Sequence, residues 1–578
     1  MARSFRRAVS VAATLILMLS AMVGAPPQRA QGSSSEFRAY WVDAFGDGLL
    51  KPTEIDKLVD AAQAAHMNAI VAQVGRRGDC FCNNASMPRT QAAIAPLPYD
   101  PLQTLIEKAH AKGLQVHAWI ITTALWNSST PPKDATHAFN MHGPSKAGMY
   151  DYWLGVKYDG SLRETASPSA SYFFDPGHPD AAQYIVDMYT SVARNYDIDG
   201  LNFDRVRYPD ITDSRWPLDN AWGYNPVALA RFHAASGRSD KPLPDDAQWS
   251  QWRRDQITGI VRKVYLETYA FKPQLRITAD TITYGDGPQA YGNDWTQTRP
   301  YRETLQDWRG WLEEGILDTN VPMNYKREHC TGGGPIPGCF GGFDQRTWYV
   351  NWSDWAKDHQ YRRSTTVGSA VYLNTIANSV IQVRKAVGPS AAGNSGIGWV
   401  GYSYRTPDDL ANAGRRSGDA SRAELTTALT QPSTYDPITP PVFADSATIP
   451  SMAWKVAPTT GHLMGTVTTD TGTPIDQIRV DLYDADTDAL IATRLTDGRG
   501  WFGFVDLVPG RYKAFVPDDA RVTGKRIVIA AVVAGAVSEV TITPFAKGHE
   551  GNRDQAGPPG SESPEAPTLA DDLPNGER

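Results

Sequence analysis

Carboxylate and amide side chains alternate with apolar ones in the stretch that ends at Asp204, and this pattern is well suited to chemistry. At a period of two residues, Asn202 and Asp204 fall on one face of a predicted strand, and Leu201 and Phe203 fall on the other. This is typical of a strand in a parallel barrel, where catalytic groups stand at the C-terminal strand ends. Asp204 is therefore a candidate catalytic carboxylate; the alternative is that it caps the following turn.

Polar side chains also occupy inward positions near the ends of other predicted strands. Barrel interiors are normally filled by Val, Ile and Leu, and a buried polar group without a partner costs about 2 kcal/mol or more. The pattern therefore favours a hydrated functional site, although the polar groups could instead satisfy one another. The residues are Gln73, His117, Asn202, Asp204 and Asp280.

Two carboxylates beside aromatic side chains fit the cleavage of a glycosidic bond. One carboxyl group protonates the departing oxygen, and the other acts on the anomeric carbon or on a water molecule. With Asp204 as the first carboxylate, the second is open among Asp280, Glu328 and Asp79. The sequence has no His-Glu-x-x-His, P-loop or Gly-x-Ser-x-Gly motif, and its histidines are scattered. This disfavours a metal-dependent deacetylase, and we expect neither a metal nor another cofactor.

Short apolar strands alternate with amphipathic helices from Phe37 to about Tyr404. This rhythm indicates βα units, and eight repeats predict an α/β fold of the (β/α)8 barrel type. An open doubly wound sheet is the alternative, but no Gly-x-Gly-x-x-Gly fingerprint follows the first strand. The predicted strands cover residues 37–42, 69–74, 114–121, 199–204, 275–280, 316–325, 365–373 and 396–402, and one helix is predicted over 300–314.

The composition changes twice beyond the barrel, which we place at residues 36–430. Residues 431–460 are rich in Pro, Thr, Ser and Ala, which is typical of a linker and implies that the parts on either side fold separately. Residues 461–545 alternate at a period of two between turn signals and predict a small all-β sandwich. Residues 546–578 are rich in Gly, Pro, Glu and Asp and are expected to be disordered.

The first 25 residues have the pattern of a secretory signal peptide, with Arg3, Arg6 and Arg7 before an apolar run. We therefore expect a secreted or cell-envelope protein of the bacterial extracytoplasmic space. An uncleaved membrane anchor is the alternative, and no later stretch is apolar enough to span a membrane. A net charge of -7 without any basic run disfavours a protein that binds nucleic acid.

All four cysteines follow the predicted signal peptide, and an even number in an exported protein favours disulfides. Cys330 and Cys339 flank a short Gly- and Pro-rich loop, and we predict that they pair. Cys80 and Cys82 are separated by one residue, which is too close for a comfortable bridge, so pairing between the two loops stays open. Neither spacing is typical of a zinc site.

Five motifs in the barrel segment are specific enough to indicate a family. They are Phe37-Arg-Ala-Tyr-Trp, Gln73-Val-Gly-Arg-Arg-Gly-Asp79, Val116-His-Ala-Trp119, Phe174-Asp-Pro-Gly-His-Pro179 and Tyr196-Asp-Ile-Asp-Gly-Leu-Asn-Phe-Asp-Arg-Val-Arg-Tyr-Pro209. With them, residues 36–404 resemble the glycosyl-hydrolase-like family 10, secreted or envelope proteins with a (β/α)8 barrel. The resemblance implies glycoside hydrolysis, with peptidoglycan glycan strands as the first substrate to consider. Residues 496–512 resemble a carboxypeptidase-regulatory-like, prealbumin-like sandwich, which is usually an accessory domain.

The resemblance transfers a catalytic role to Asp204 and marks the matching positions on the second and third strands. The fifth strand departs from the family, because a Ser-Pro-Phe-Gly-like run is replaced by Thr278-Ala-Asp-Thr281. We expect basic, acidic and amide groups to hydrogen-bond sugar hydroxyls, and aromatic rings to stack on sugars. The expected substrate-binding residues are Gln73, Arg76, Asp79, His117, Asn202, Trp119, Tyr325 and Trp399.

A protein that binds glycans, or an envelope scaffold protein, with a degenerate barrel site is the alternative to an enzyme. The two classes differ in the separation of their carboxyl groups, which is roughly 5–10 Å in a hydrolytic pair. The expected partner is a polysaccharide or a peptidoglycan glycan in either case.

Overall fold

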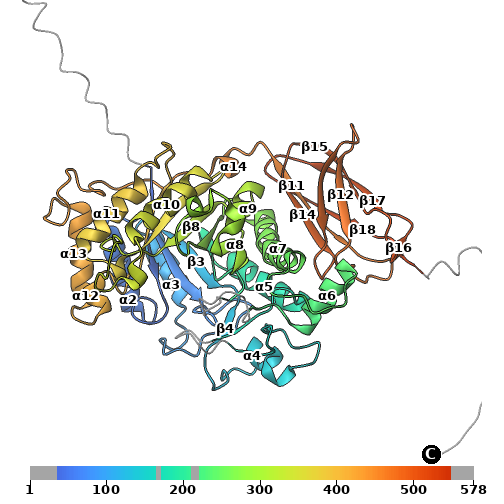
Figure 1. The fold of residues 1–578 in the computed structure, drawn as a ribbon, viewed down its shortest axis with the longest axis horizontal. Coiled ribbons are helices and arrows are strands. Elements are labelled where there is room, and N and C mark those ends of the chain that lie inside the picture. Colours follow the sequence, from blue (N-terminus) through green and yellow to red (C-terminus); the bar gives the residue numbers. More distant parts are fainter. Residues whose placement is uncertain (1–34, 164–170, 210–220, 548–578) are drawn as a thin grey trace, which may run out of the picture.

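The computed structural model describes residues 35–163, 171–209 and 221–547 (Figure 1). The predicted signal peptide at residues 1–25, and nearly all of the predicted disordered tail, lie outside these ranges. No helix within them is both long enough and apolar enough to cross a bilayer.

Eight parallel strands close into a barrel in the order β1-β10-β9-β8-β7-β6-β3-β2, which confirms the predicted fold class. Register pairs such as Phe203–Ala279 between β6 and β7 place residues of neighbouring strands side by side. The barrel strands are β1 (Phe37–Val42), β2 (Ala69–Gly75), β3 (Gln115–Ile121), β6 (Gly200–Asp204), β7 (Arg276–Ile282), β8 (Thr319–Asn324), β9 (Ser364–Ala370) and β10 (Gly398–Tyr402).

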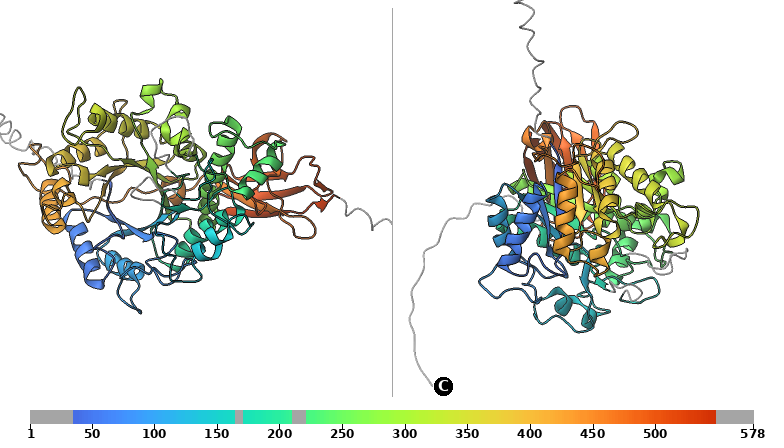
Figure 2. Two further views of the ribbon diagram at one scale, coloured as in Figure 1. Left: turned by 60° about the horizontal axis from the view of Figure 1, so that its bottom comes forward. Right: turned by 90° about the vertical axis from the view of Figure 1, so that its left-hand side faces the viewer.

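Helices cover the outside of the barrel (Figure 2). One predicted helix, over residues 300–314, is two helices, the first of which ends at Arg302; Leu305, which lies between them, adopts a positive φ of 56°. Asp307 then caps the second by accepting a hydrogen bond from the backbone of Gly310. The main helices are α2 (Pro52–Ala64), α3 (Pro101–His110), α5 (Pro179–Asn195), α6 (Pro226–Ser236), α7 (Ala247–Phe271), α8 (Arg299–Arg302), α9 (Trp308–Glu314), α10 (Gln345–Asp358), α11 (Ile376–Val387) and α13 (Gly418–Thr430).

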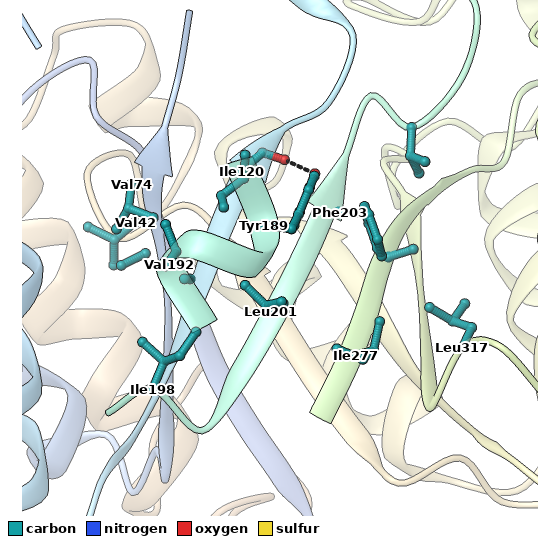
Figure 3. Close-up of a cluster of buried hydrophobic side chains, with 14 of the residues drawn as sticks. Val42, Val74, Ile120, Tyr189, Val192, Ile198, Leu201, Phe203, Ile277 and Leu317 are labelled. Carbon is teal, nitrogen blue, oxygen red and sulfur yellow. Dashed lines mark hydrogen bonds between the residues drawn. The ribbon is translucent and has the colours of Figure 1, made fainter. Parts of the chain in front are cut away.

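The apolar faces of the strands form the core between barrel and helices. Leu201 and Phe203 point outward as predicted, and the Phe203 ring lies 4.3 Å from that of Tyr189 on α5 (Figure 3). The Tyr189 hydroxyl donates to the carbonyl of Ile120 on β3 at 2.8 Å, so this buried polar group is satisfied. The outward packing of β6 leaves Asn202 and Asp204 facing the barrel interior.

Residues 461–546 form two packed sheets with one apolar core, as the period-two pattern predicted. One sheet has the order β14-β11-β18, and the other has the order β13-β12-β15-β17. The strands are β11 (Gly461–Val467), β12 (Arg479–Asp484), β13 (Leu490–Leu495), β14 (Trp501–Leu507), β15 (Gly510–Phe515), β17 (Ile527–Val532) and β18 (Val537–Ile542).

The chain between the barrel and this sandwich is packed rather than loose. Residues 436–456, which we call the basal segment, cross the N-terminal ends of the barrel strands. Phe443 is fully buried, and Ile449 packs against the apolar cluster inside the barrel. The polar contacts are Arg38 Nη1 to Asp445 O (2.6 Å), Arg276 Nη2 to Pro450 O (2.6 Å), Trp454 Nε1 to Asp318 Oδ1 (2.7 Å) and Lys455 Nζ to Asp318 Oδ2 (2.5 Å).

Figure 1 shows the sandwich beside α7, and ion pairs join the sandwich to the barrel unit. Most of the acidic partners come from the sandwich and most of the basic ones from the barrel. The pairs are Arg231–Asp476 (2.6 Å), Lys263–Asp497 (2.9 Å), Arg363–Asp506 (2.8 Å), Glu314–Arg494 (3.0 Å) and Asp180–Arg499 (2.7 Å).

Both cysteine pairs lie at disulfide distance. Cys330–Cys339 confirms the prediction. For Cys80–Cys82 the expectation that the spacing is too close was wrong. The chain bends at Phe81 and brings the two Cα atoms to 5.0 Å, which is within the range that a disulfide spans.

Candidate functional site

Asp204 stands at the C-terminal end of β6 with both carboxylate oxygens hydrogen-bonded. Oδ2 accepts from Trp119 Nε1 on β3 at 3.0 Å, and Oδ1 accepts from the backbone N–H of Arg205 at 2.6 Å. Arg205 has a positive φ of 49°, so the chain turns sharply and its amide points back at the carboxylate. Two N–H donors on a carboxylate make strong, charge-assisted hydrogen bonds that fix its orientation.

Asp280 is the neighbour of Asp204 on the next strand, β7. Both residues directly follow the register pair Phe203–Ala279. Asp280 is only 2% exposed; its Oδ2 accepts from Asn202 Nδ2 at 2.8 Å, and its Oδ1 has no partner among the described residues. Burial, and then the nearby charge of Asp204, raises the pKa of Asp280 well above its usual 3.8. Both causes favour the protonated form of Asp280 relative to that of an exposed aspartate.

Asn202 is oriented by a second hydrogen bond. Thr278 Oγ1 donates to Asn202 Oδ1 at 2.6 Å, which fixes the amide with its Nδ2 toward Asp280. Asn202 thus lies on the same face as Asp204, as the alternation predicted, but its contact is with the other carboxyl group. Its role here is to position Asp280.

Aromatic rings surround the two carboxyl groups at this end of the barrel. Tyr325 stacks on Tyr402 at 5.5 Å with an interplanar angle of 18°, and the rings of Trp41 and Trp119 lie 6.2 and 6.3 Å from that of Tyr402. Trp119 and Tyr325 were predicted. The sequence did not predict Trp41 and Tyr402, although Trp41 lies in a quoted motif and Tyr402 ends a predicted strand. It also did not predict Tyr372, whose ring lies 5.7 Å from that of Tyr402.

Trp399 is placed elsewhere. It is fully buried on the outer side of β10, where its Nε1 donates to Ser369 Oγ at 3.0 Å. Its ring lies 6.5 Å from that of Tyr40 and 6.0 Å from that of Phe443 in the basal segment. The structure does not bring Trp399 to the carboxyl pair.

His117 faces the barrel interior, as predicted, but near the N-terminal strand ends. Its ring lies 5.1 Å from that of Phe37, and a Cβ on Gly200 would lie 2.2 Å from its Nδ1. Burial, and then the charge of Arg276, lowers the pKa of His117 to about 3, so the ring is neutral. It lies two positions before Trp119 on β3, which is one interior layer below the site.

Gln73 and Arg76 lie at the C-terminal end of β2 and contact the loop after β1. Gln73 Oε1 accepts from Ala44 N at 3.0 Å, and Arg76 Nη1 donates to Ala44 O at 2.6 Å. Asp79 is buried in its own loop, where its Oδ2 accepts from Thr90 Oγ1 at 2.7 Å. These side chains therefore shape the loops around the site.

Glu328, the other candidate carboxylate, is held in ion pairs. Its Oε1 lies 2.6 Å from Lys385 Nζ on α11 and 3.3 Å from Arg346 on α10, and the residue is buried. It ties the loop after β8 to these helices. Of the three candidates for the second carboxylate, the structure brings Asp280 next to Asp204.

Other clusters in the described residues lack the features of this site. His329, Cys330 and Cys339 lie within ligand distance of one another, but both sulfur atoms belong to the disulfide. A cleft of about 300 Å³ lies between the barrel and the sandwich, lined by residues that include Lys263, Arg494 and Trp501. The basic residues of this cleft are already paired with acidic ones.

Two acidic side chains on adjacent strands, at the C-terminal end of a (β/α)8 barrel and among aromatic rings, define the class of glycan-acting hydrolase folds. The chain belongs to the family described as Glycosyl hydrolase-like 10, which matches residues 36–336. This confirms the resemblance seen in the sequence.

Two relatives have names of the same kind. Glycosyl hydrolase DigH of Escherichia coli K12 is 24% identical over 324 residues, which cover 52% of this chain and 68% of that protein. Glycosyl hydrolase YngK of Bacillus subtilis 168 is 24% identical over 322 residues, which cover 51% of this chain and 54% of that protein. The match thus spans about half of the length of YngK.

Solved structures show weaker likeness. The PgaB (BpsB) glycoside hydrolase domain from Bordetella bronchiseptica is 17% identical with a TM-score of 0.43, over 67% of this chain and 98% of that domain. The catalytic domain of beta-amylase from Paenibacillus polymyxa is 12% identical with a TM-score of 0.44, over 68% of this chain and 97% of that one.

Proposed function

We propose that this protein is a glycoside hydrolase that cleaves a polysaccharide with Asp280 as general acid and Asp204 as nucleophile. The observation that carries the proposal is the difference between two adjacent carboxyl groups. Asp204 accepts two N–H hydrogen bonds, whereas burial raises the pKa of Asp280 well above its usual value. Paired groups whose environments separate their pKa values are the usual basis for acid and base roles.

The reaction would have two steps. In the first, Asp280 gives its proton to the glycosidic oxygen while an Asp204 oxygen bonds to the anomeric carbon, and the sugar beyond the broken bond departs as an alcohol. In the second, the Asp280 carboxylate takes a proton from a water molecule, whose oxygen displaces Asp204 and restores both groups. Adjacent strands lie about 4.8 Å apart, which favours the ~5–5.5 Å carboxyl separation of retaining enzymes.

The neighbouring side chains would keep the two carboxyl groups in these roles. Trp119 would hold Asp204 in the orientation for attack. Asn202, itself fixed by Thr278, would orient Asp280 toward the departing oxygen. The rings of Tyr325, Tyr402 and Trp41 would offer apolar faces to the sugar on either side of the bond.

Peptidoglycan glycan strands are the first substrate to test. The family, and the glycosyl hydrolase names of its relatives, support a glycan substrate. The predicted signal peptide supports an extracytoplasmic location, where such strands are found. A panel that includes peptidoglycan stripped of its peptides would identify the sugar and the linkage.

Variants of the two carboxylates test the mechanism. We expect Asp204→Asn to lose at least about 10²-fold in turnover, and azide to restore cleavage with the opposite anomeric configuration, because the small anion can replace a missing nucleophile. Asp280→Asn should lose far more turnover on a natural glycan than on an aryl glycoside with an acidic leaving group, which needs little protonation.

Two outcomes would contradict this assignment. If Glu328→Gln, and not Asp280→Asn, gives the dependence on the leaving group, the acid is wrongly assigned. If the wild-type protein binds glycans but cleaves none of the panel, the protein is a glycan-binding member of the family. Thermal unfolding of each variant distinguishes a lost chemical group from a lost fold.

A further inference from the structure

The loop after β1, residues 43–48, holds an exposed aromatic ring at the rim of the barrel. Phe45 is 55% exposed and lies four residues beyond Trp41, whose ring belongs to the site. A single exposed Phe on a protein surface normally needs no explanation. The surroundings of Phe45 are unusual, because they fix the ring firmly while they leave it exposed.

Buried polar contacts hold the backbone on the N-terminal side of the ring. The N–H of Phe45 donates to Oδ1 of buried Asp43 at 3.0 Å. The N–H of Ala44 donates to Gln73 Oε1 at 3.0 Å, and its carbonyl accepts from Arg76 Nη1 at 2.6 Å. Side chains from the ends of β1 and β2 thus satisfy the backbone groups of Ala44 and Phe45. The loop therefore cannot easily move so that the Phe45 ring packs against the protein.

Arg76 also supports one face of the ring. Its guanidinium lies 3.8 Å from the centre of the Phe45 ring, which is a close cation–π contact. Burial lowers the pKa of Arg76 to about 10, so the group is still charged at neutral pH. No second ring or cation packs on Phe45 among the described residues, and the opposite face of the ring is left for a ligand.

Arg405, which follows β10, brings a hydrogen-bond donor against the loop that carries Phe45, where it contacts Asp43 and Gly46. Its Nε pairs with Asp43 Oδ1 at 3.2 Å, and its side chain is otherwise exposed. Gly46 allows this approach, because a Cβ there would lie 2.5 Å from Arg405 Cδ. The terminal Nη groups of Arg405 have no hydrogen-bond partner in the described part of the chain, so they can donate to an added molecule.

An aromatic ring beside a guanidinium group can bind both the apolar face of a pyranose ring and its hydroxyl groups. The C–H face of a sugar packs on an aromatic ring, and its hydroxyl groups accept hydrogen bonds from planar donors. We propose that Phe45 and Arg405 form a distal subsite for one sugar of a long glycan, and that Asp43, Gln73 and Arg76 position it. The proposal rests on the proposed glycan substrate.

The position of the subsite determines the length of glycan that can contact both it and the two carboxyl groups. Phe45 follows β1, whereas Asp204 ends β6 and Asp280 lies near the end of β7. The strands β2 and β3 stand between β1 and β6 in the barrel order. A glycan that reaches both places must cross the end of the barrel past Trp119 and Tyr402. The subsite therefore contributes only to substrates of several sugars.

The test compares oligosaccharides of increasing length with an aryl monoglycoside. We expect Phe45→Ala to lower the ratio of kcat/KM for long to short substrates about tenfold, chiefly through KM, and Phe45→Trp to keep it. Arg76→Gln should lower the same ratio because it frees the ring. Tyr361→Ala is the matched control, since Tyr361 is also an exposed ring but precedes β9 at the opposite end of the barrel.

Several results would overturn the subsite. An equal loss on long and short substrates would show that Phe45 acts on the reaction centre or the fold, and an unchanged ratio would show that the ring binds nothing. If the wild-type protein cleaves no glycan, calorimetric binding of a long oligosaccharide replaces kinetics. A binding loss in Phe45→Ala would then support the subsite although the proposed hydrolysis had failed, and equal binding would refute it.

Discussion

Asp280 illustrates how a single residue can serve chemistry at the expense of stability. Its carboxyl group is buried beside another carboxylate, and one of its oxygens has no hydrogen-bond partner in the ranges that the structure describes. A folded-state pKa above the unfolded value means that the folded chain binds this proton more tightly than the unfolded chain does. Below the unfolded-state pKa, the protonated group makes its full contribution to the free energy of unfolding. This contribution is lost as the pH rises through the folded-state pKa.

This linkage predicts a pH-dependent effect of Asp280→Asn. The amide resembles the neutral acid, so its contribution to stability does not change with pH. We expect the two proteins to differ least in free energy of unfolding below pH 3.8, the usual pKa of the group, and the variant to become progressively more stable than wild type at higher pH. Urea unfolding across a pH series measures this. A constant difference at every pH would show that the Asp280 pKa is not raised by folding.

At the residue scale, the sequence predicts well which face of a strand a residue lies on. It predicts less well how far along the barrel axis the residue lies. Alternation placed Asn202, Asp204 and Asp280 correctly because their strands contrast polar with apolar faces. It placed His117 inside but could not show that it lies one layer too deep. It gave no orientation for Trp399, because Gly398 to Tyr402 offers no contrast between polar and apolar faces, and the expectation that this ring stacks on a sugar was not supported.

At the scale of elements, the basal segment shows why a composition typical of a linker can mislead. Its polar contacts to the barrel are made largely through its own carbonyl groups, such as those of Asp445 and Pro450, which accept from Arg38 and Arg276. Every residue type has a backbone carbonyl group, so contacts through these groups could not be predicted from the Pro, Thr, Ser and Ala content. The contacts indicate that the barrel unit extends to about Val456, beyond the expected boundary at residue 430.

Phe443→Ala tests whether the basal segment belongs to the barrel. The side chain is fully buried against Trp399, and the Arg38 guanidinium lies 4.2 Å from its ring centre. We expect a loss of about 3–5 kcal/mol in free energy of unfolding, as is usual for a buried Phe. Ile438→Ala, at an exposed position of the same segment, should change it by less than about 0.5 kcal/mol. Similar small effects of both would mean that the segment is a loose linker.

At the scale of the whole molecule, the ion pairs between barrel and sandwich differ in burial. The Arg231 side chain is 8% exposed. Its Nε and Nη2 donate to the two oxygens of Asp476, and its Nη1 donates to the carbonyl of Gly177. The Arg499 side chain is 51% exposed and contacts Asp180 alone among the described residues. Removing one partner of a partly buried ion pair leaves the other charge buried without a counter-charge, and this costs stability at the interface. An exposed ion pair contributes little to stability.

These two arginines give a matched prediction. We expect Arg231→Ala to lower the free energy of unfolding by about 3 kcal/mol and to separate the unfolding of sandwich and barrel into two transitions. Arg499→Ala should lower it by less than about 1 kcal/mol and keep a single transition. Differential scanning calorimetry measures both effects. Equal effects of the two variants would show that the interface does not depend on the buried pair.

The position of the basal segment also determines when, during synthesis of the chain, the barrel can be completed. The chain is made from the N-terminus at about 5–20 residues per second, and all eight barrel strands exist once Tyr402 has been added. Ile449, which packs against the cluster inside the barrel, and Lys455, which neutralises Asp318, are added only some fifty residues later. A chain that ends before residue 449 therefore has all eight barrel strands but leaves one end of the barrel uncovered, so the barrel cannot be completed before synthesis has nearly reached the sandwich.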